Sequence, residues 1–391
     1  MREGWKSVRL EEVCTFKPPK KEARQRLNPD DLVSFVPMNN LGVRKKVLEL
    51  GEDRTLEEVA GGYTYFADGD VLLAKITPCF ENGKLGIASG LSNGVGFGSS
   101  EFIVMRPNVE LDAEYLFYFL SQDSVRDAGA RVMSGAVGHK RVPKEFIEEL
   151  ELPLPELAEQ KRIVSLLDEA LEGIDTVVAN TEKNLTNVRE LFESYLNAVE
   201  ANSQSLGDLV DIRTGKLNAN AAVKGGAYPF FTCSRETFKI DKIAFDCEAI
   251  LLAGNNASGD FNVKHYFGKF NAYQLTYVIT IKNEEILLYR YLYFQFVKSL
   301  KGLKEVSIGV GTKYLKLGMI KDLKIGVPPI KQQKKIVNIL DNLLSDLNRL
   351  ESIYQQKLAA LAELKQSLLQ KAFSGELTAR EAEAAVEEAT A

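Results

Sequence analysis

Apolar side chains over residues 163–195 recur at intervals of three and four residues, which is the spacing of a coiled-coil seam. A second seam over residues 336–368 repeats the first at a constant offset of 173 residues. No proline interrupts either seam, whereas Pro155 and Pro328 precede them and set the helix starts. The pattern therefore predicts two helices, each about 60 Å long at ~1.5 Å per residue, that pair through their seams. The seam positions are Ile163, Leu167, Ala170, Ile174, Val177, Thr181, Leu185, Val188, Leu191 and Tyr195, and then Ile336, Leu340, Leu343, Leu347, Leu350, Tyr354, Leu358, Leu361, Leu364 and Leu368.

The chain is an internal duplication. The stretch PELAEQKRIVSLLD (155–168) shares seven of fourteen residues with PPIKQQKKIVNILD (328–341). Fainter matches join 133–150 to 306–323, 114–120 to 290–296, and 70–75 to 249–254. Each half is therefore predicted to be a globule followed by one long helix.

Short apolar runs such as DVLLAKI, EFIVM, AILLA and QLTYVITI predict strands within each globule. The expected fold class is α+β, with two mixed α/β domains separated by two long coiled-coil helices and related by a pseudo-twofold duplication. The helices are expected to be antiparallel, because the link at 199–206 reaches only about 25 Å and cannot return along a helix. The expected domains are 1–152 and 204–326 (globules), 153–203 and 327–378 (helices), and 379–391 (a disordered tail).

The composition is that of an ordinary soluble protein, with 45% hydrophobic and 26% charged residues among 391. No apolar run is long enough for a membrane span, and the charged N-terminus is no signal peptide. The four cysteines are widely spaced, without a Cys-x-x-Cys pair. This cysteine usage fits a reducing cytoplasm, so a cytoplasmic protein is expected.

Charge is distributed unevenly along the chain. The net charge of −5 argues against a nucleic-acid binder, yet residues 205–330 hold 17 basic and 11 acidic side chains. Residues 1–154 hold 20 basic and 24 acidic side chains. The second globule therefore suits an anionic partner, although drift in surface composition would explain the same numbers.

The motifs of common enzymes are missing from the sequence. The stretches ENGK (81–84) and RTGK (213–216) lack the first glycine and the Ser/Thr of a phosphate-binding loop. Two histidines and four scattered cysteines do not form a metal site at any usual spacing. These absences favour a binding protein without catalytic, cofactor or metal residues.

The duplicated openings P-x-x-EQKRIV-x-x-LD and PP-x-x-QQKKIV-x-x-LD resemble the conserved regions of Type I restriction–modification specificity subunits. The ending SLLQKAFSGEL (367–377) is similar to that family as well. Residues 62–86 and 96–107 look like the family's first target recognition domain, and residues 228–279 look like its second. The resemblance covers nearly the whole chain.

This resemblance implies a non-catalytic subunit that recognises double-stranded DNA. Each globule would read one half of an interrupted asymmetric site, and the coiled coil would set the spacer and dock two modification subunits. S-adenosylmethionine would belong to those methyltransferase subunits, and ATP and Mg to two restriction subunits that join in some assemblies. A methyltransferase accessory without a nuclease partner fits the sequence too, and so does a coiled-coil scaffold with protein-binding head domains.

Candidate DNA-contacting residues lie in loops at equivalent strand ends of the two globules. Forked donors and acceptors read base edges, whereas a lysine suits phosphate contact. The same asparagines, glycines and serines would also serve as simple turn formers. The candidates are Lys75, Thr77, Asn82, Lys84, Ser99, Ser100, Glu101, Lys140 and Arg141 in the first globule, and Asn255, Asn256, Ser258, Lys264, Tyr273, Gln274, Lys313 and Tyr314 in the second.

Two basic stretches are the expected DNA face of the acidic first globule, KPPKKEARQR (17–26) and RKK (44–46). The stretches Gln160–Arg162 and Gln333–Lys335 are expected to cap the helix starts or to meet the modification subunit. Trp5 is expected in the core of the first globule.

Overall fold

The structure is a computed structural model that describes residues 4–136, 138–197, 202–377 and 379–390. It divides into two compact units. Unit 1 comprises Met1–Thr181 and Gln356–Ala391, and unit 2 comprises Glu182–Gln355. Each unit therefore holds one globule with the beginning of one long helix and the end of the other.

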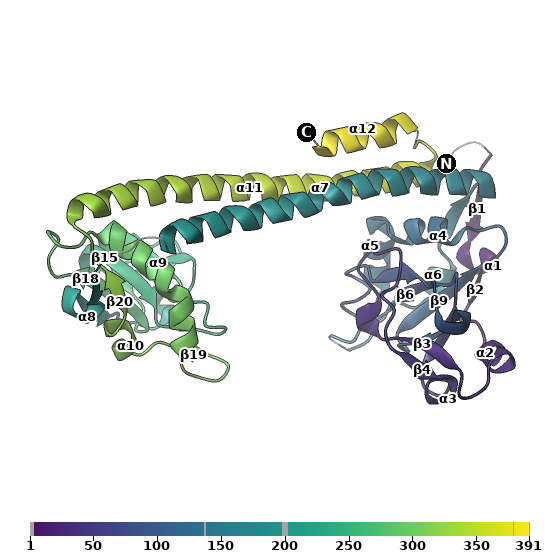
Figure 1. Cartoon of the computed structure of the whole chain (residues 1–391), viewed down its shortest axis with the longest axis horizontal. Coiled ribbons are helices and arrows are strands. Elements are labelled where there is room, and N and C mark those ends of the chain that lie inside the picture. Colours follow the sequence, from purple (N-terminus) through teal and green to yellow (C-terminus); the bar gives the residue numbers. More distant parts are fainter. Residues whose placement is uncertain (1–3, 137, 198–201, 378, 391) are drawn as a thin grey trace. The chain divides into compact units, whose positions relative to one another are not determined.

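The two long helices are α7 (Leu157–Asn197) and α11 (Ile330–Ser374), coloured teal and yellow-green in Figure 1. In unit 1, Asp175 near the middle of α7 pairs with Lys365 toward the end of α11. In unit 2, Arg189 later in α7 donates to Glu351 earlier in α11 at 2.7 Å. Advancing along α7 thus means going backward along α11, which confirms the antiparallel coiled coil.

The predicted seam fails at one late α7 position, whereas Tyr195 packs against the core of the second globule. Leu191 is 63% exposed, whereas its neighbour Phe192 is 8% exposed. Phe192 packs against Phe294 of α9 (Tyr289–Val306), with ring centroids 6.4 Å apart. The end of α7 therefore buries the face that meets the second globule, and the seam continues through Phe192 and Leu196.

The first globule extends from β1 to β10, and two four-stranded sheets form it. One sheet has the order β2-β9-β6-β7, and the other has the order β4-β3-β8-β5 with β3 parallel to β8. The strands are β1 (Lys6–Arg9), β2 (Cys14–Phe16), β3 (Leu32–Val36), β4 (Asp53–Thr55), β5 (Thr64–Ala67), β6 (Val71–Ala74), β7 (Leu85–Ile87), β8 (Val95–Gly98), β9 (Phe102–Pro107) and β10 (Glu151–Leu154). The helices are α1 (Leu10–Val13), α2 (Lys21–Arg26), α3 (Leu56–Val59), α4 (Ala113–Leu120), α5 (Asp123–Val132) and α6 (Lys144–Glu148).

The second globule extends from β11 to β20, and a six-stranded sheet of order β12-β18-β15-β17-β13-β14 forms its centre. Its strands are β11 (Ser203–Ser205), β12 (Val210–Thr214), β13 (Tyr228–Phe231), β14 (Thr237–Ile240), β15 (Phe245–Ala253), β16 (Asn255–Asn256), β17 (Val263–Ala272), β18 (Thr276–Ile281), β19 (Lys313–Tyr314) and β20 (Lys324–Gly326). The helices besides α9 are α8 (Leu206–Leu209) and α10 (Leu317–Lys321). The strands expected from DVLLAKI, EFIVM, AILLA and QLTYVITI are β6, β9, the end of β15 and β18, which confirms them.

The two globules share one topology. The order β12-β18-β15-β17 repeats β2-β9-β6-β7, and β13 runs parallel to β17 as β3 runs parallel to β8. In the second globule, β15 and β17 are two long antiparallel partners. In the first globule, β5 and β6 together correspond to β15, and β7 and β8 together correspond to β17. There, β5 pairs with β8 and β6 pairs with β7. The duplication inferred from faint sequence matches thus extends to strand order.

Alternation along β6 explains the layers of the first globule. Val71 and Leu73 face α4 and the long helices in one core. Leu72 and Ala74 face the opposite way, into a second core between the two sheets. Successive strand residues point to opposite faces, so the apolar run VLLA marks a strand buried on both sides. Trp5 packs against the first of these cores, which confirms its expected place.

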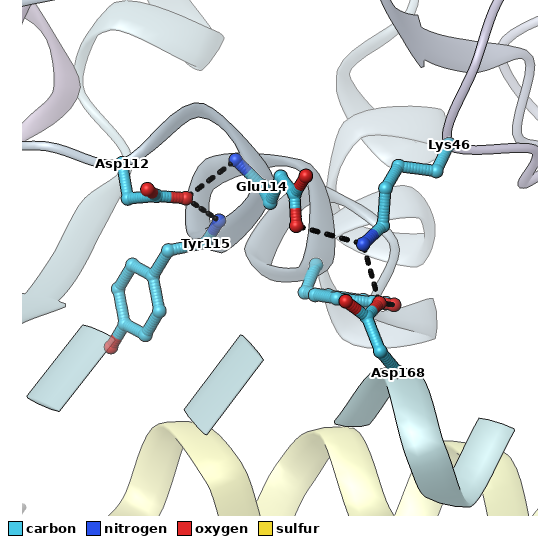
Figure 2. A network of polar contacts seen from close by, with 6 residues as sticks. Lys46, Asp112, Glu114, Tyr115 and Asp168 are labelled. Atoms are coloured by element: carbon cyan, nitrogen blue, oxygen red, sulfur yellow. Dashed lines mark hydrogen bonds and ion pairs between the residues drawn. The ribbon is translucent and has the colours of Figure 1, made fainter. Parts of the chain in front are cut away.

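A fully buried glutamine joins the first globule to α7. Gln160 Nε2 donates to the carbonyls of Glu110 (2.8 Å) and Pro155 (2.9 Å), and its Oε1 accepts from the amide of Asp112 (2.9 Å). Asp112 in turn caps α4 by accepting from the amides of Glu114 and Tyr115, as Figure 2 shows.

Gln333 makes the same three hydrogen bonds in the second globule. Its amide donates to Ile286 and Pro328, both at 2.7 Å, and accepts from the amide of Leu288 at 3.0 Å. Both glutamines are 0% exposed. A tyrosine repeats alongside, because Tyr115 donates to the Pro153 carbonyl and Tyr291 donates to that of Gly326, each at 2.8 Å.

The last segment, 379–391, was expected to be disordered, and this is wrong for its described part. Residues Ala379–Thr390 form the helix α12. Ala382, Ala385 and Ala389 are buried in the same core as the start of α7. A Cβ on Gly173 of α7 would lie 3.0 Å from Val386, so a glycine permits this close approach. The small alanine side chains of this segment allow the helix to pack closely.

We predict that replacing Gln333 with Met destabilises the protein far more than the same change at its exposed neighbour Gln332. The first substitution leaves two carbonyls and one amide, one contact of which is buried and two part-buried, without partners, at up to about 1–3 kcal/mol for each group. The free energy of unfolding in urea measures both variants, and Gln160→Met is expected to repeat the loss in the first globule. Equal stability of the Gln333→Met and Gln332→Met variants would contradict a stabilising role for the hydrogen bonds of Gln333.

Candidate nucleic-acid interface

Three separate segments meet at one edge of the first globule's sheet, and we call residues 75–84, 99–101 and 138–141 the first loop cluster. The Lys75 amide donates to the Glu101 carbonyl at 2.9 Å, since both segments begin where β6 and β9 pair. The Thr77 amide donates to the Lys140 carbonyl at 2.9 Å. Backbone hydrogen bonds therefore hold all three segments together.

The second loop cluster consists of residues 254–262, 273–275 and 311–314 of the second globule. The Gly254 amide donates to the Leu275 carbonyl at 2.8 Å, which repeats the contact between Lys75 and Glu101. Asn255 pairs with Tyr314 between β16 and β19, as Ile76 pairs with Arg141 in the first globule. The clusters thus occupy equivalent edges of equivalent sheets, and they contain every sequence candidate except Lys264, which lies on β17.

Internal contacts occupy several of the first cluster's candidates. Arg141 and Glu101 form a two-pronged ion pair, with N–O distances of 2.9 and 2.8 Å. These bonds hold the pKa of Glu101 below its usual range. The Lys84 ammonium donates to the Met38 carbonyl at 2.8 Å, and Ser99 Oγ accepts from the Glu101 amide. These four side chains therefore support the loops.

The second cluster contains supporting side chains of the same kind. Asn256 Oδ1 accepts from the amide (2.9 Å) and hydroxyl (3.0 Å) of Ser258, so this pair forms the turn. Lys264 donates to the carbonyls of Ser234 (2.7 Å) and Glu236 (3.0 Å), and burial lowers its pKa. Its ammonium therefore fastens the 234–236 loop to the sheet.

The remaining candidates have side chains without a hydrogen-bond or ion-pair partner within the described part of the chain. Most are half-buried or exposed, so their polar groups are available to a ligand. Thr77 differs, because its hydroxyl is buried without a partner. The set is Lys75, Thr77, Asn82, Ser100 and Lys140 in the first cluster, and Asn255, Tyr273, Gln274, Lys313 and Tyr314 in the second.

The expectation that RKK (44–46) forms a basic DNA face is wrong. Lys46 donates to Glu114 at 2.8 Å and pairs with Asp168 of α7, as Figure 2 shows. Lys45 pairs with Glu49 at 2.8 Å, and Arg44 pairs with Asp123 at 2.7 Å. All three cations are neutralised, and Lys46 fastens the globule to the helix.

Asp341, the duplicate of Asp168, repeats this contact with a different cation. It pairs with Arg290 of α9, whose Nε lies 2.7 Å from the carboxylate. Arg290 occupies the position of Glu114 in the aligned helices, so the two halves conserve the carboxylate and exchange its partner.

The other basic stretch, 17–26, keeps unpaired cations. Arg26 donates to the Asn93 carbonyl, and Lys20 donates to the carbonyls of Ala60 and Gly61. Lys17, Lys21 and Arg24 are exposed and have no side-chain partner among the residues described.

Sequence reasoning missed the counterparts of this stretch in the second globule. Arg213 and Lys216 lie at and after the end of β12, where Lys17 follows β2, and Lys242 precedes β15. An alignment of the two halves by strand order would have found them. In that alignment FKPPK (16–20) at the end of β2 corresponds to RTGKL (213–217) at the end of β12.

The described residues contain neither a membrane-spanning helix nor a cluster of metal ligands. No helix among them is long and apolar enough to cross a membrane. No group of three or more His, Cys, Asp or Glu side chains within the same residues is arranged to hold a metal ion.

Comparison with known families gives one match that covers most of the chain. The family described as "Type I restriction modification DNA specificity domain" matches residues 2–186 and 199–359. The Type I restriction enzyme EcoEI specificity subunit of Escherichia coli is 37% identical over 210 residues, which cover 54% of this chain and 34% of that protein. The EcoDI subunit is 40% identical over 181 residues, with coverages of 46% and 39%. The chain thus spans between a third and two fifths of these two relatives.

A longer alignment joins the chain to the StySPI specificity subunit of Salmonella potsdam. It has 22% identity and covers 97% of this chain and 90% of that protein. Among solved structures, a chain from the "type I R-M system" superposes with a TM-score of 0.77 at 20% identity, covering 96% of this chain and 99% of the other. The HsdS subunit from Thermoanaerobacter tengcongensis gives a TM-score of 0.55 at 19% identity, with coverages of 96% and 98%. These superpositions establish a shared fold.

We predict that the ion pair in the first loop cluster contributes stability only above acidic pH. The pKa of Glu101 is lowered in the folded state, so its contribution is present above the unfolded value of about 4.3 and is lost as pH falls through the folded value. Glu101→Gln is expected to cost at most ~1 kcal/mol at pH 7, because the pair is partly exposed, and less as the pH falls below about 4.3. Urea unfolding from neutral to acidic pH, with Glu81→Gln as the exposed control, measures the difference. A cost that does not diminish toward acidic pH would exclude the ion pair as its source.

Proposed function

Because the chain belongs to the family of the Type I restriction modification DNA specificity domain, we propose that it is the sequence-specific DNA-recognition subunit of a Type I restriction–modification complex. Each globule reads one half of an interrupted asymmetric site in double-stranded DNA. The long helices set the spacer between the halves and dock two modification subunits. The chain spans 34% and 39% of the two relatives described first, so its activity and partners are proposed here.

The observation that carries this proposal is the repeated loop cluster. Each globule presents, at the same edge of the same sheet, side chains able to donate and accept hydrogen bonds. Side-chain amides such as those of Asn82, Asn255 and Gln274 suit adenine. The two clusters differ in nearly every free side chain, so two different half-sites follow from one framework.

The starts of the long helices supply a surface for protein partners. Gln160 and Gln333 are buried, whereas Lys161, Lys334 and Lys335 beside them are exposed. Their side chains have no hydrogen-bond or ion-pair partner within the described residues. A repeated polar surface at the start of each helix suits two copies of one modification subunit.

Catalysis and its cofactors belong to the partners in this proposal. S-adenosylmethionine is bound by the modification subunits, and ATP and Mg are bound by restriction subunits where these join. The chain itself works in the cytoplasm, where its DNA is. The rival scaffold function predicts no salt-dependent DNA affinity, and membership of a DNA specificity family does not favour it.

We predict that exchanging residues 204–326 for those of a relative changes one half of the recognised sequence and leaves the other half intact. Each loop cluster is closed within its own globule, so its contacts travel with the exchanged segment. Sequencing the methylated adenines in DNA co-expressed with the modification subunit gives the result. The reciprocal exchange of residues 1–152 serves as the control and is expected to alter the opposite half. Simultaneous change of both halves would refute modular reading.

We predict that lengthening both helices lengthens the spacer. Seven residues inserted between Asp175 and Arg189, and seven between Glu351 and Lys365, keep the seam in register. They add about 10 Å at ~1.5 Å per residue, which corresponds to about three base pairs of B-DNA at ~3.4 Å each. The same methylation sequencing measures the spacer. An unchanged spacer in a folded, active variant would show that the helices are not the ruler.

A further inference from the structure

A cavity of about 500 Å³ lies beside the first loop cluster. Four lysines line it, together with the aromatic rings of Phe16 and Tyr65. Two of these lysines, Lys17 and Lys75, have no hydrogen-bond or ion-pair partner among the described residues. Of the others, Lys20 faces two backbone carbonyls and Lys144 pairs with Glu148.

A second cavity, of about 560 Å³, lies in the other globule. Arg213, Lys216 and Lys242 line it, and all three are exposed. Within the described part of the chain, these cations have no hydrogen-bond or ion-pair partner either. Asn271 of β17 adds a polar side chain to the same wall.

The two cavities occupy equivalent places in the duplicated fold. The first lies between the segment that follows β2 and the start of β5. The second lies between the end of β12 with its following segment and the start of β15. Strand β12 lies beside β18 as β2 lies beside β9. The first part of β15 corresponds to β5. Both globules therefore have a cation-lined cavity at the equivalent place, although different residues line it.

Electrostatics make both cavities suited to an anion. No Asp or Glu is among the described residues that line either one. Burial, then the nearby cations Arg24 and Lys17, lower the pKa of Lys20. Like charges held together in this way repel one another, and a bound anion would relieve that repulsion. The concentration of cations is notable because residues 1–154 are acidic overall.

The first cavity shares residues with its loop cluster, and the second is joined to its cluster by a backbone hydrogen bond. Lys75 and Ser100 of the first cluster line the first cavity. In the second globule, Leu217 lines the cavity and its carbonyl accepts from the amide of Gln274 at 2.9 Å. A ligand held by a loop cluster would therefore extend directly to the adjoining cations.

We propose that the two cavities are paired phosphate sites that hold the DNA backbone beside the bases read by each loop cluster. The inference rests on the proposed DNA recognition and adds to it a division of labour. The cavity cations, Lys75 included, position the duplex and contribute no sequence preference, whereas the other free side chains of the loop clusters select bases. Lys17 and Lys75 serve the first half-site, and Arg213, Lys216 and Lys242 serve the second.

The test measures the affinity of the full chain for a labelled duplex of random sequence over a range of KCl concentrations. Each phosphate contact contributes about 0.9 to the slope of log K against log salt. Lys17→Ala/Lys75→Ala is expected to make the slope shallower by about 2, and Arg213→Ala/Lys216→Ala/Lys242→Ala by about 3. Lys6→Ala/Lys183→Ala, which removes two exposed lysines that line neither cavity, is the matched control for the first double variant and keeps the slope. Lys17→Arg/Lys75→Arg keeps it as well.

The outcomes separate this inference from the function on which it rests. Absence of salt-dependent binding by the unmodified chain would overturn both. Binding by the unmodified chain with slopes unchanged in the cavity variants would overturn the phosphate sites alone. A parallel titration with ATP and with inorganic phosphate identifies the source of the phosphate. If the cavity variants lose binding of these small anions but keep the full DNA slope, the sites belong to free phosphates and the assignment to DNA fails.

Discussion

A buried glutamine amide joins each globule to the long helix that follows it, and the arrangement within each unit depends on this junction. Gln160 and Gln333 are fully buried and satisfy three backbone groups apiece. A side chain that both donates and accepts is required there, because an apolar substitute would leave carbonyls and an amide unpaired. The same amide contacts the loop before α4 or α9, so it orients the helix that packs beneath the sheet.

The duplication preserves the framework and varies what the framework carries. Strand order, the glutamine and tyrosine contacts and the loop-to-loop hydrogen bonds recur in both globules. The side chains left free in the loops hardly recur at all. The ion pairs to the long helices recur in part. The carboxylates Asp168 and Asp341 are equivalent, whereas their partners Lys46 and Arg290 belong to different elements. A symmetric frame with unlike contents suits recognition of an asymmetric ligand.

Sequence pattern predicted the features that depend on periodicity: both long helices, their starts, their direction and the main strands. It also indicated loops that the structure brings together, because polar residues beside buried strands meet at one end of the sheet. It could not show which side chains were occupied, since partners such as Met38 for Lys84 lie 46 residues away. The error over RKK (44–46) has the same origin for Arg44 and Lys46, because the carboxylates that pair with them come from α4, α5 and α7. Helix α12 was missed because its alanines signal packing only beside the Gly173 that accommodates them.

The antiparallel pairing of the two long helices has a consequence for the order of folding. The glutamine junctions close between residues 48 or 45 positions apart, whereas the ion pair of Asp175 with Lys365 closes 190 positions. Closing a longer chain loop costs more entropy, and contacts of high sequence separation form slowly. Each globule is thus expected to mature with the start of its own helix, even during synthesis. The seam can close only after α11 emerges, so the first globule waits for its last covering helix until the chain is almost complete.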